Sequence, residues 1–260
     1  MLVKRLGGQP AAAWIAGTIY ELGCFFASQA EHTPAIHGAS WLPLAWLCVV
    51  ELSSGLRWGW LATLSISLSM TVLAGFPQVA VAAFGSVLLL AAPFAFLRLA
   101  RRVLPFQVLL AWAWALALAA VEVIPTAKLT RNSVAKYRAE WLGGGGGIKL
   151  QALLSLVIPN YWSVFDLSKF HGPSDPTFLY LYSSLFGLVL ALAAICWKPD
   201  TLTRAFSLLT LAAAIWMFGD STPIGRTIFL FLPVSIRIGI HPEYTLCVFA
   251  LALAVLNRTS

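Results

Sequence analysis

Long blocks of apolar residues recur along the whole chain, and they constrain its fold more than any other feature of the sequence. Only 10% of the 260 residues are charged, against about 25% in an ordinary soluble domain, so the chain cannot build a water-soluble surface. The blocks lack the strict alternation of a transmembrane β-strand, and the longer ones approach the roughly 20 residues that cross a bilayer as a helix. Eight blocks can be read, at residues 11–28, 39–52, 58–73, 79–96, 106–123, 178–197, 205–218 and 244–256.

These blocks predict an all-α fold, a polytopic transmembrane helical bundle of about eight spans that forms a single domain over residues 1–260. A soluble globular enzyme and a disordered chain are both excluded by the hydrophobicity. The four cysteines all fall inside apolar blocks and form no CxxC pair, so we expect no disulfide framework and no zinc site.

Basic residues predict the orientation of the spans. Nine of the 17 Lys and Arg residues lie before the first block, after the last one, or in alternate loops between blocks, whereas the opposite short loops around 31–38 and 75–78 hold none. Because cytoplasmic loops are enriched in Lys and Arg, we expect a cytoplasmic N-terminus in a multi-pass cell-membrane protein. The net charge of +7 then reflects topology, and no nucleic-acid partner is expected.

Two outer loops are long, residues 124–177 and 219–243. The first contains five consecutive glycines at 143–147, which favour a flexible hinge. The apolar pieces at 148–158 and 228–234 are too short to span a bilayer, and we expect them to be interfacial or re-entrant helices. Loops of this length are usually functional or disordered.

Polar residues of the outer loops are the candidates for chemistry. The Lys and Arg side chains of these loops can bind phosphate through charge-assisted hydrogen bonds. The alternative is that they lie among lipid head groups or in solvent. Glu31, His32 and His37 can act as acid, base or metal ligands, although their spacing matches no known ligand motif, and a solvated turn is the alternative. Glu21 and Glu122 lie in or near apolar blocks, where a carboxylate is costly and points to function.

Four stretches, in order along the chain, resemble the YfhO family of bacterial membrane proteins, which belongs to the GT-C glycosyltransferase superfamily. The first runs from Tyr20 through His32 to ASWLP at 39–43, and the second is AGFPQ at 74–78. The third is a polar tract that begins at Ile124 and ends in LVIPNY at 156–161. The fourth is GDSTP at 219–223, followed by Leu232, Pro233 and Arg237.

The resemblance implies a GT-C-like fold in a bacterial cytoplasmic membrane and transfer of a sugar from a polyprenyl-phosphate donor to a cell-envelope acceptor. Membrane lipid is a further implied partner. No cofactor is identified, although a divalent metal is possible. On this interpretation Tyr161 and Trp162 stack on the sugar or carrier, and the residues that line the site are His32, Gln78, Lys128, Arg131, Arg138 and Arg237.

The family's catalytic acidic residue lies on an outer loop that would precede Met1 in this numbering. We therefore expect a fragment or the product of a split gene, and no catalytic residue is assigned. Two other functions stay open. A transporter or flippase would have internal repeats and broken helices near the middle of the membrane. A non-catalytic membrane scaffold would need neither.

Overall fold

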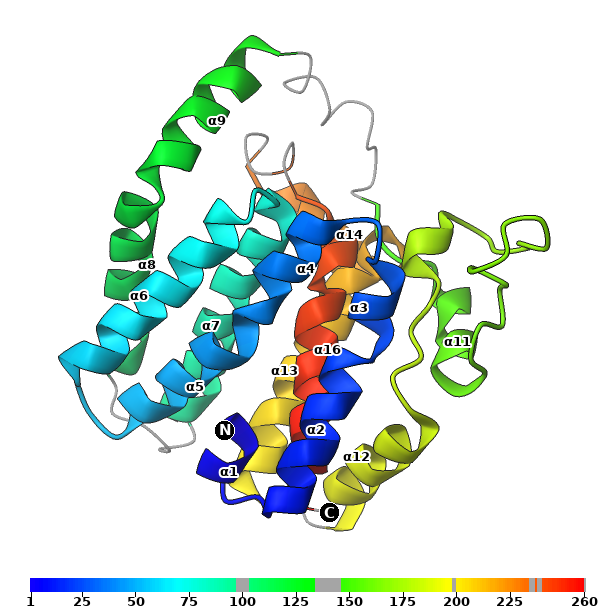
Figure 1. The fold of residues 1–260 in the computed structure, drawn as a ribbon, viewed down its shortest axis with the longest axis horizontal. Helices are drawn as coiled ribbons and strands as arrows, with labels where there is room; N and C mark the ends of the chain where they lie inside the picture. The colour runs from blue at the N-terminus through cyan, green and yellow to red at the C-terminus, as the bar shows by residue number, and fades with distance from the viewer. Residues whose placement is uncertain (97–102, 134–145, 198–199, 234–236, 238–239, 260) are drawn as a thin grey trace.

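The computed structural model describes residues 1–96, 103–133, 146–197, 200–233, 237 and 240–259. Within these ranges the regular structure is entirely helical, which confirms the predicted all-α class. Figure 1 shows the longer helices side by side in one bundle. The α-helices are α1 (Leu2–Arg5), α2 (Pro10–Glu21), α3 (Cys24–Ser28), α4 (Thr33–Ser40), α5 (Leu42–Ser53), α6 (Trp58–Leu73), α7 (Pro77–Phe96), α8 (Leu104–Leu118), α9 (Ala120–Asn132), α11 (Leu154–Val157), α12 (Leu185–Trp197), α13 (Thr201–Met217), α14 (Pro223–Phe231) and α16 (Leu246–Leu256). Short 3₁₀ turns are η2 (Leu150–Leu153), η3 (Pro176–Phe178), η4 (Gly219–Ser221), η5 (Pro242–Thr245) and η6 (Asn257–Thr259).

Each predicted apolar block corresponds to an apolar helix, but few of these helices are long enough to cross a bilayer. Among the described residues, three stretches have the required length and hydropathy, Pro10–Ser28, Thr33–Ser53 and Pro77–Ala95. A fourth is reached if α8 and α9, which meet at an angle of 78°, count as one bent span. The fold is thus an all-helical one with three to four helices able to span a membrane, and the number of about eight spans stays a prediction.

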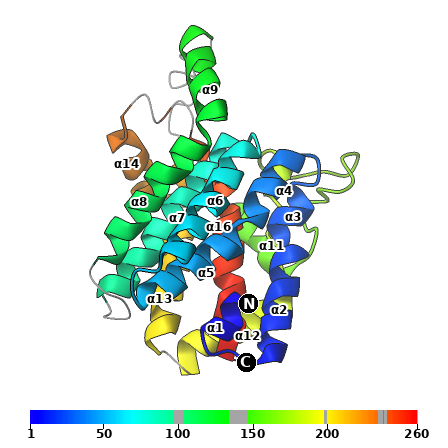
Figure 2. The same cartoon turned by 60° about the vertical axis from the view of Figure 1, so that its left-hand side comes forward.

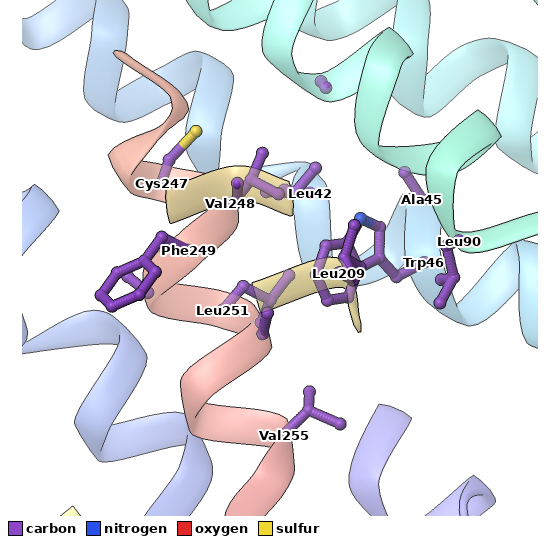
Figure 3. Packing of buried hydrophobic residues seen from close by; sticks show 14 of the residues in the cluster. Leu42, Ala45, Trp46, Leu90, Leu209, Cys247, Val248, Phe249, Leu251 and Val255 are labelled. Carbon is purple, nitrogen blue, oxygen red and sulfur yellow. The ribbon is translucent and has the colours of Figure 1, made fainter. Parts of the chain in front are cut away.

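Helix α16 forms the centre of the bundle, although its block was among the shortest in the sequence. All residues of α16 are buried, and it packs against α2, α3, α7, α12 and α13. A helix that is apolar on every side is expected in a core, and the small side chains of Ala250, Ala252 and Ala254 let neighbouring helices approach closely. Figure 3 shows this packing, with Cys247, Val248, Phe249, Leu251 and Val255 of α16 near Leu42, Ala45, Trp46, Leu90 and Leu209.

Local sequence signals set the starts of several helices. Proline lies in the first turn of α2, α4, α5, α8 and α14, where its missing N–H costs nothing. Asp200 caps α13 by accepting a hydrogen bond from the Thr203 N–H, and Thr222 caps α14 by accepting one from the Gly225 N–H.

The first predicted span, residues 11–28, agrees with the stretch Pro10–Ser28, although the helix is interrupted between α2 and α3, where the Cys24 N–H donates to Ser183 Oγ over 3.3 Å. Two other predicted span boundaries are wrong. The sixth predicted span, which corresponds to α12, begins at residue 185 instead of 178, because residues 179–184 are not helical and bury Leu179 and Leu181. The second predicted span begins at residue 33 instead of 39, because α4 continues almost directly into α5.

The predicted outer loops also differ from the structure. Residues 120–132 form α9, so helix replaces the start of the expected loop at 124–177. Pro125 lies inside α9, where its missing N–H removes one intrahelical hydrogen bond without ending the helix. The expected helix at 148–158 is only the turn η2 followed by α11, and the piece expected at 228–234 is replaced by α14, which ends at Phe231.

The bundle has two distinct ends, which Figures 1 and 2 both show. The termini end holds α1, the turn between α5 and α6, the start of α13 and the C-terminal turn η6. The loop end holds the turn between α3 and α4, the turn between α6 and α7, the projecting helix α9, and the elements η4, α14 and η5. The described basic residues of the predicted cytoplasmic loops belong to elements of the termini end, namely Lys4 and Arg5 on α1, Arg57 just before α6, Arg204 on α13 and Arg258 in η6.

Candidate functional site at the loop end

Three glycines hold two distant chain segments together at the loop end, and we call Gly146, Gly147 and Gly219 the glycine junction. The Asp220 N–H donates to the Gly146 carbonyl over 2.8 Å, and the Ile148 N–H donates to the Met217 carbonyl over the same distance. The last two glycines of the run are therefore anchored to the turn after α13, so the flexible hinge expected for residues 143–147 does not extend to Gly146 and Gly147. Residues 143–145 lie outside the described residues.

The backbone conformation of the junction favours glycine at all three positions. All three residues have positive φ angles, +72° at Gly146, +119° at Gly147 and +44° at Gly219. A Cβ atom on Gly147 would lie 2.6 Å from the Phe218 carbonyl oxygen, and one on Gly219 would lie 2.2 Å from the Gly146 carbonyl oxygen. At Gly147 and Gly219 a side chain is thus excluded by both backbone conformation and space, whereas at Gly146 the positive φ angle favours glycine and the nearest atom to a Cβ would be Glu243 Oε1 at 2.9 Å.

Charged side chains surround the junction. Glu243 Oε1 accepts a hydrogen bond from the Gly147 N–H over 2.8 Å, and Glu243 Oε2 lies 3.9 Å from His241 Nδ1. On the other side, Lys149 Nζ lies 3.8 Å from Asp220 Oδ1. The carboxylates of Asp220 and Glu243, the Lys149 ammonium and the His241 imidazole therefore all lie around the backbone of the glycine junction.

A chain of aromatic rings crosses the same end of the bundle. Tyr244 lies at its centre, with ring centroids 4.7 Å from Phe76, 5.0 Å from Phe178 and 6.3 Å from His241. Phe76 in turn lies 6.0 Å from the ring of His32. These contacts bring the turn between α3 and α4 and the turn between α6 and α7 next to η5.

An apolar pocket of about 260 Å³ lies between α7, α13 and α16 and reaches this end. Its polar rim includes Gln78, His241 and Thr245. Its walls are almost wholly apolar, made by residues such as Val81, Leu89, Ala213, Trp216 and Val248. Such a pocket suits an amphipathic ligand, with its apolar part between the helices and its polar part at the rim.

The structure brings together some of the residues predicted for the site. His32 joins the aromatic chain, and Gln78 lies on the pocket rim. Arg237 lies in the segment between Leu232 and Ile240, which both line the pocket, and its guanidinium carbon is 5.9 Å from the ring centroid of Phe229.

The other predicted residues lie elsewhere. Lys128 and Arg131 are exposed on α9, a helix with no buried residue that projects beyond the bundle (Figure 2). Tyr161 and Trp162 form a separate aromatic cluster with His171, at centroid distances of 4.8 to 6.0 Å. Arg138 lies outside the described residues.

Several buried polar atoms at this end have no hydrogen-bond partner within the described part of the chain. They include both amide atoms of the fully buried Gln29, as well as His32 Nδ1 and Arg237 Nε. Buried polar groups are normally paired, so these atoms keep unused hydrogen-bonding capacity, although none of the three residues lines the apolar pocket. The same ranges contain no group of three or more His, Cys, Asp or Glu side chains that could hold a metal ion.

Sequence reasoning assigned no role to several of these residues. Asp220 and the neighbouring residues His241, Glu243 and Tyr244 are far from the glycine run in the sequence, and only the fold places them around the junction. The run of five glycines was the available signal, because so many glycines in a row permit close backbone contact as well as flexibility.

The termini end holds buried charge that sequence reasoning also missed. Glu51 is buried, and its carboxylate pairs with Arg5 Nε at 2.5 Å and with Arg57 Nη1 at 3.3 Å. By contrast, Glu21 and Glu122, the carboxylates singled out from the sequence, are exposed. The overlooked signal was Glu51 inside the second apolar block, because Arg57 follows it six residues later and Arg5 lies near the N-terminus.

A second ion pair at the termini end predicts a pH-dependent stability. Partial burial raises the pKa of Asp200, but hydrogen bonds from Thr203 and the Arg258 guanidinium outweigh burial and lower that pKa below its ordinary 3.8. The stabilisation from this charge is therefore complete above the ordinary pKa and is lost as the pH falls through the lowered value. We expect Asp200→Asn, which keeps the helix cap, to lower the Tm by about 2–4 °C at pH 6 and by less at pH 3. Thermal unfolding of both proteins from pH 3 to 7 measures this, and a difference independent of pH would contradict it.

No family model matches the chain, and no match exists among the curated proteins or the solved structures.

Proposed function

We propose that this chain binds a lipid-linked sugar phosphate at the loop end of the bundle and takes part in transferring the sugar to an acceptor outside the cytoplasmic membrane. The observation that carries the proposal is the apolar pocket between α7, α13 and α16, whose rim is polar. Sugar transfer and the polyprenyl carrier come from the resemblance to the YfhO family, and the pocket supplies a place for such a molecule.

The dimensions of the pocket suit the start of an isoprenoid chain. Gln78 on the rim and Leu89 in the wall are eleven residues apart on α7, a separation of about 16 Å along the helix axis. An isoprenoid chain entering between the helices would meet apolar side chains along this length, apart from Ser86, whose hydroxyl already donates to the Ala83 carbonyl and accepts from Trp46 Nε1. Its phosphate would then stay at the rim.

The rim offers the charges that such a reaction needs. The acceptor oxygen forms a bond to the sugar while the bond between the sugar and the carrier phosphate breaks, so negative charge grows on the leaving phosphate. Cations stabilise that charge, and Lys149 and Arg237 are the candidates at this end.

A base must also take the proton of the acceptor hydroxyl. Asp220 suits this role, because its side chain is partly exposed and its nearest cation, Lys149, is 3.8 Å away. Glu243 is committed to the Gly147 N–H. The partly exposed rings of Phe76 and Phe178, which both pack against the buried Tyr244, provide apolar faces on which a sugar can stack.

Replacing Arg237 by Ala tests the proposal. We expect the rate of sugar transfer to fall about tenfold or more, because a charge-assisted contact to phosphate is worth roughly 1.5–3 kcal/mol. The measurement is transfer of label from a polyprenyl-phosphate sugar in membranes that carry the full-length gene product. Arg226→Ala is the matched control, since Arg226 is exposed on α14 nearby and should leave the rate unchanged.

Two outcomes would count against the proposal. Equal transfer by the Arg237→Ala and Arg226→Ala variants would remove Arg237 from the site. Absence of transfer by the folded wild-type protein with every carrier offered would favour a transporter or a scaffold.

A further inference from the structure

A second apolar cavity, at the termini end, is separate from the pocket of the proposed function. It has a volume of about 330 Å³ and lies between α2 and α5, with Leu251, Ala254 and Val255 of α16 as its floor. Helix α1 closes one end with Met1, Leu2 and Val3, and Figure 1 shows α1 at the foot of α2 and α5. We call this cavity the terminal groove.

The terminal groove has an aliphatic lining. Its walls are made by small and aliphatic side chains of α2 and α5, such as Ala13, Ala16, Leu44 and Leu47. Tyr20 also contributes, but its hydroxyl donates to the Ala39 carbonyl over 2.9 Å. A peptide in this groove would find few partners for its backbone, whereas a hydrocarbon chain needs none.

A pair of arginines lies where the groove ends. Leu47 lines the groove, and Glu51 lies four residues further along α5, hence on the same face and one helical turn away. Glu51 holds Arg5 through Nε and Nη2, at 2.5 and 3.2 Å, and Arg57 through Nη1 at 3.3 Å. One carboxylate therefore fixes two guanidinium groups about one helical turn beyond the groove lining.

The cluster presents positive charge outward. The Glu51 side chain is only 9% exposed, whereas those of Arg5 and Arg57 are 51% and 55% exposed. Two guanidinium groups and one carboxylate leave a net charge of about +1, and each arginine keeps N–H donors that Glu51 does not use. The exposed Lys4 adds a further cation on α1.

We propose that the terminal groove and the Arg5–Arg57 pair bind one anionic phospholipid from the membrane leaflet at the termini end. One acyl chain lies in the groove, and the phosphate accepts hydrogen bonds from both guanidinium groups. Arginine suits this role because its planar donors match phosphate oxygens, and Glu51 holds both arginines in place before the lipid arrives. Charge complementarity selects an anionic head group over a zwitterionic one.

Native mass spectrometry of the purified chain in detergent, supplied with phosphatidylglycerol or phosphatidylcholine, tests the proposal. We expect the wild type to retain one phosphatidylglycerol at concentrations about tenfold below those needed for phosphatidylcholine. The triple variant Arg5→Gln, Glu51→Gln, Arg57→Gln removes the arginines without stranding a buried carboxylate, and it should lose this preference. Arg226→Gln removes an exposed cation at the loop end and should keep it.

A groove variant tests the acyl-chain half of the proposal separately. Gly17 lines the groove, and a Cβ atom there would meet nothing within 4 Å, so Gly17→Phe fills the cavity without backbone strain. It should weaken phosphatidylglycerol binding about tenfold, whereas Gly59→Phe, at an equally open and exposed helical glycine, should not. Equal retention of the two lipids by the wild type, or unchanged binding by either site variant with a wild-type Tm, would overturn the proposal.

Discussion

Replacing Gly147 by Ala should destabilise the protein by about 3 kcal/mol, because the substitution adds two costs at one position. The residue has a φ of +119°, a conformation that costs an L-amino acid roughly 1–3 kcal/mol. The new methyl group would also lie 2.6 Å from the Phe218 carbonyl oxygen, which belongs to backbone and cannot rotate away. The free energy of unfolding should therefore fall, with a decrease in Tm of about 6–12 °C in detergent.

The matched control is Gly59→Ala, the same chemical change on α6. Gly59 is exposed and helical, and a Cβ atom there meets nothing within 4 Å, so its Tm should equal or slightly exceed that of the wild type. If both variants unfold at the same temperature, the glycine junction does not hold residues 146–149 against the turn after α13.

Removing both arginines that pair with Glu51 should destabilise the bundle as well. The variant Arg5→Gln, Arg57→Gln leaves a carboxylate that is 9% exposed without its cations. Breaking a fully buried pair costs roughly 3–5 kcal/mol, and we expect about 2 kcal/mol here because the guanidinium groups are half exposed and screened by solvent. The Tm should fall by about 4–8 °C.

A third substitution distinguishes this cause from a general loss of packing around α1. Adding Glu51→Gln to the double variant neutralises the stranded carboxylate and should restore most of the lost Tm. Lys4→Gln, a charge removal at an exposed neighbour on the same helix, should have little effect alone. A triple variant no more stable than the double variant would show that the carboxylate is not the source of the cost.

The sequence predicted the helices better than it predicted their breaks. Apolar blocks identify helices because burial or a membrane needs long apolar faces, and each block does contain one. The break at Gly23 depends on Ser183, and the late start of α12 depends on burial of Leu179 and Leu181, so both are set by contacts across the fold. The central place of α16 was equally hidden, because an all-apolar helix suits a lipid environment and a protein core alike.

The candidate site was only partly predictable for a related reason. His32 and Gln78 were named from motifs, and they reach the aromatic chain and the pocket rim. Asp220 and Glu243 gain their significance only through the junction, where two segments about 70 to 100 residues apart share hydrogen bonds. Cations such as Lys128 were candidates because of their charge, but the charge of a residue does not predict that its helix, here α9, projects away from the bundle.

The proposed location of the lipid carrier can be measured directly with a photoreactive polyprenyl phosphate in nanodiscs that contain the wild-type protein. Cross-links mapped by mass spectrometry should fall on pocket residues of α7, α13 and α16, such as Val81, Ala213 and Val248, and should disappear when unlabelled carrier competes. Cross-links confined to other surfaces, or unaffected by competition, would contradict the assignment of this pocket to a lipid-linked substrate.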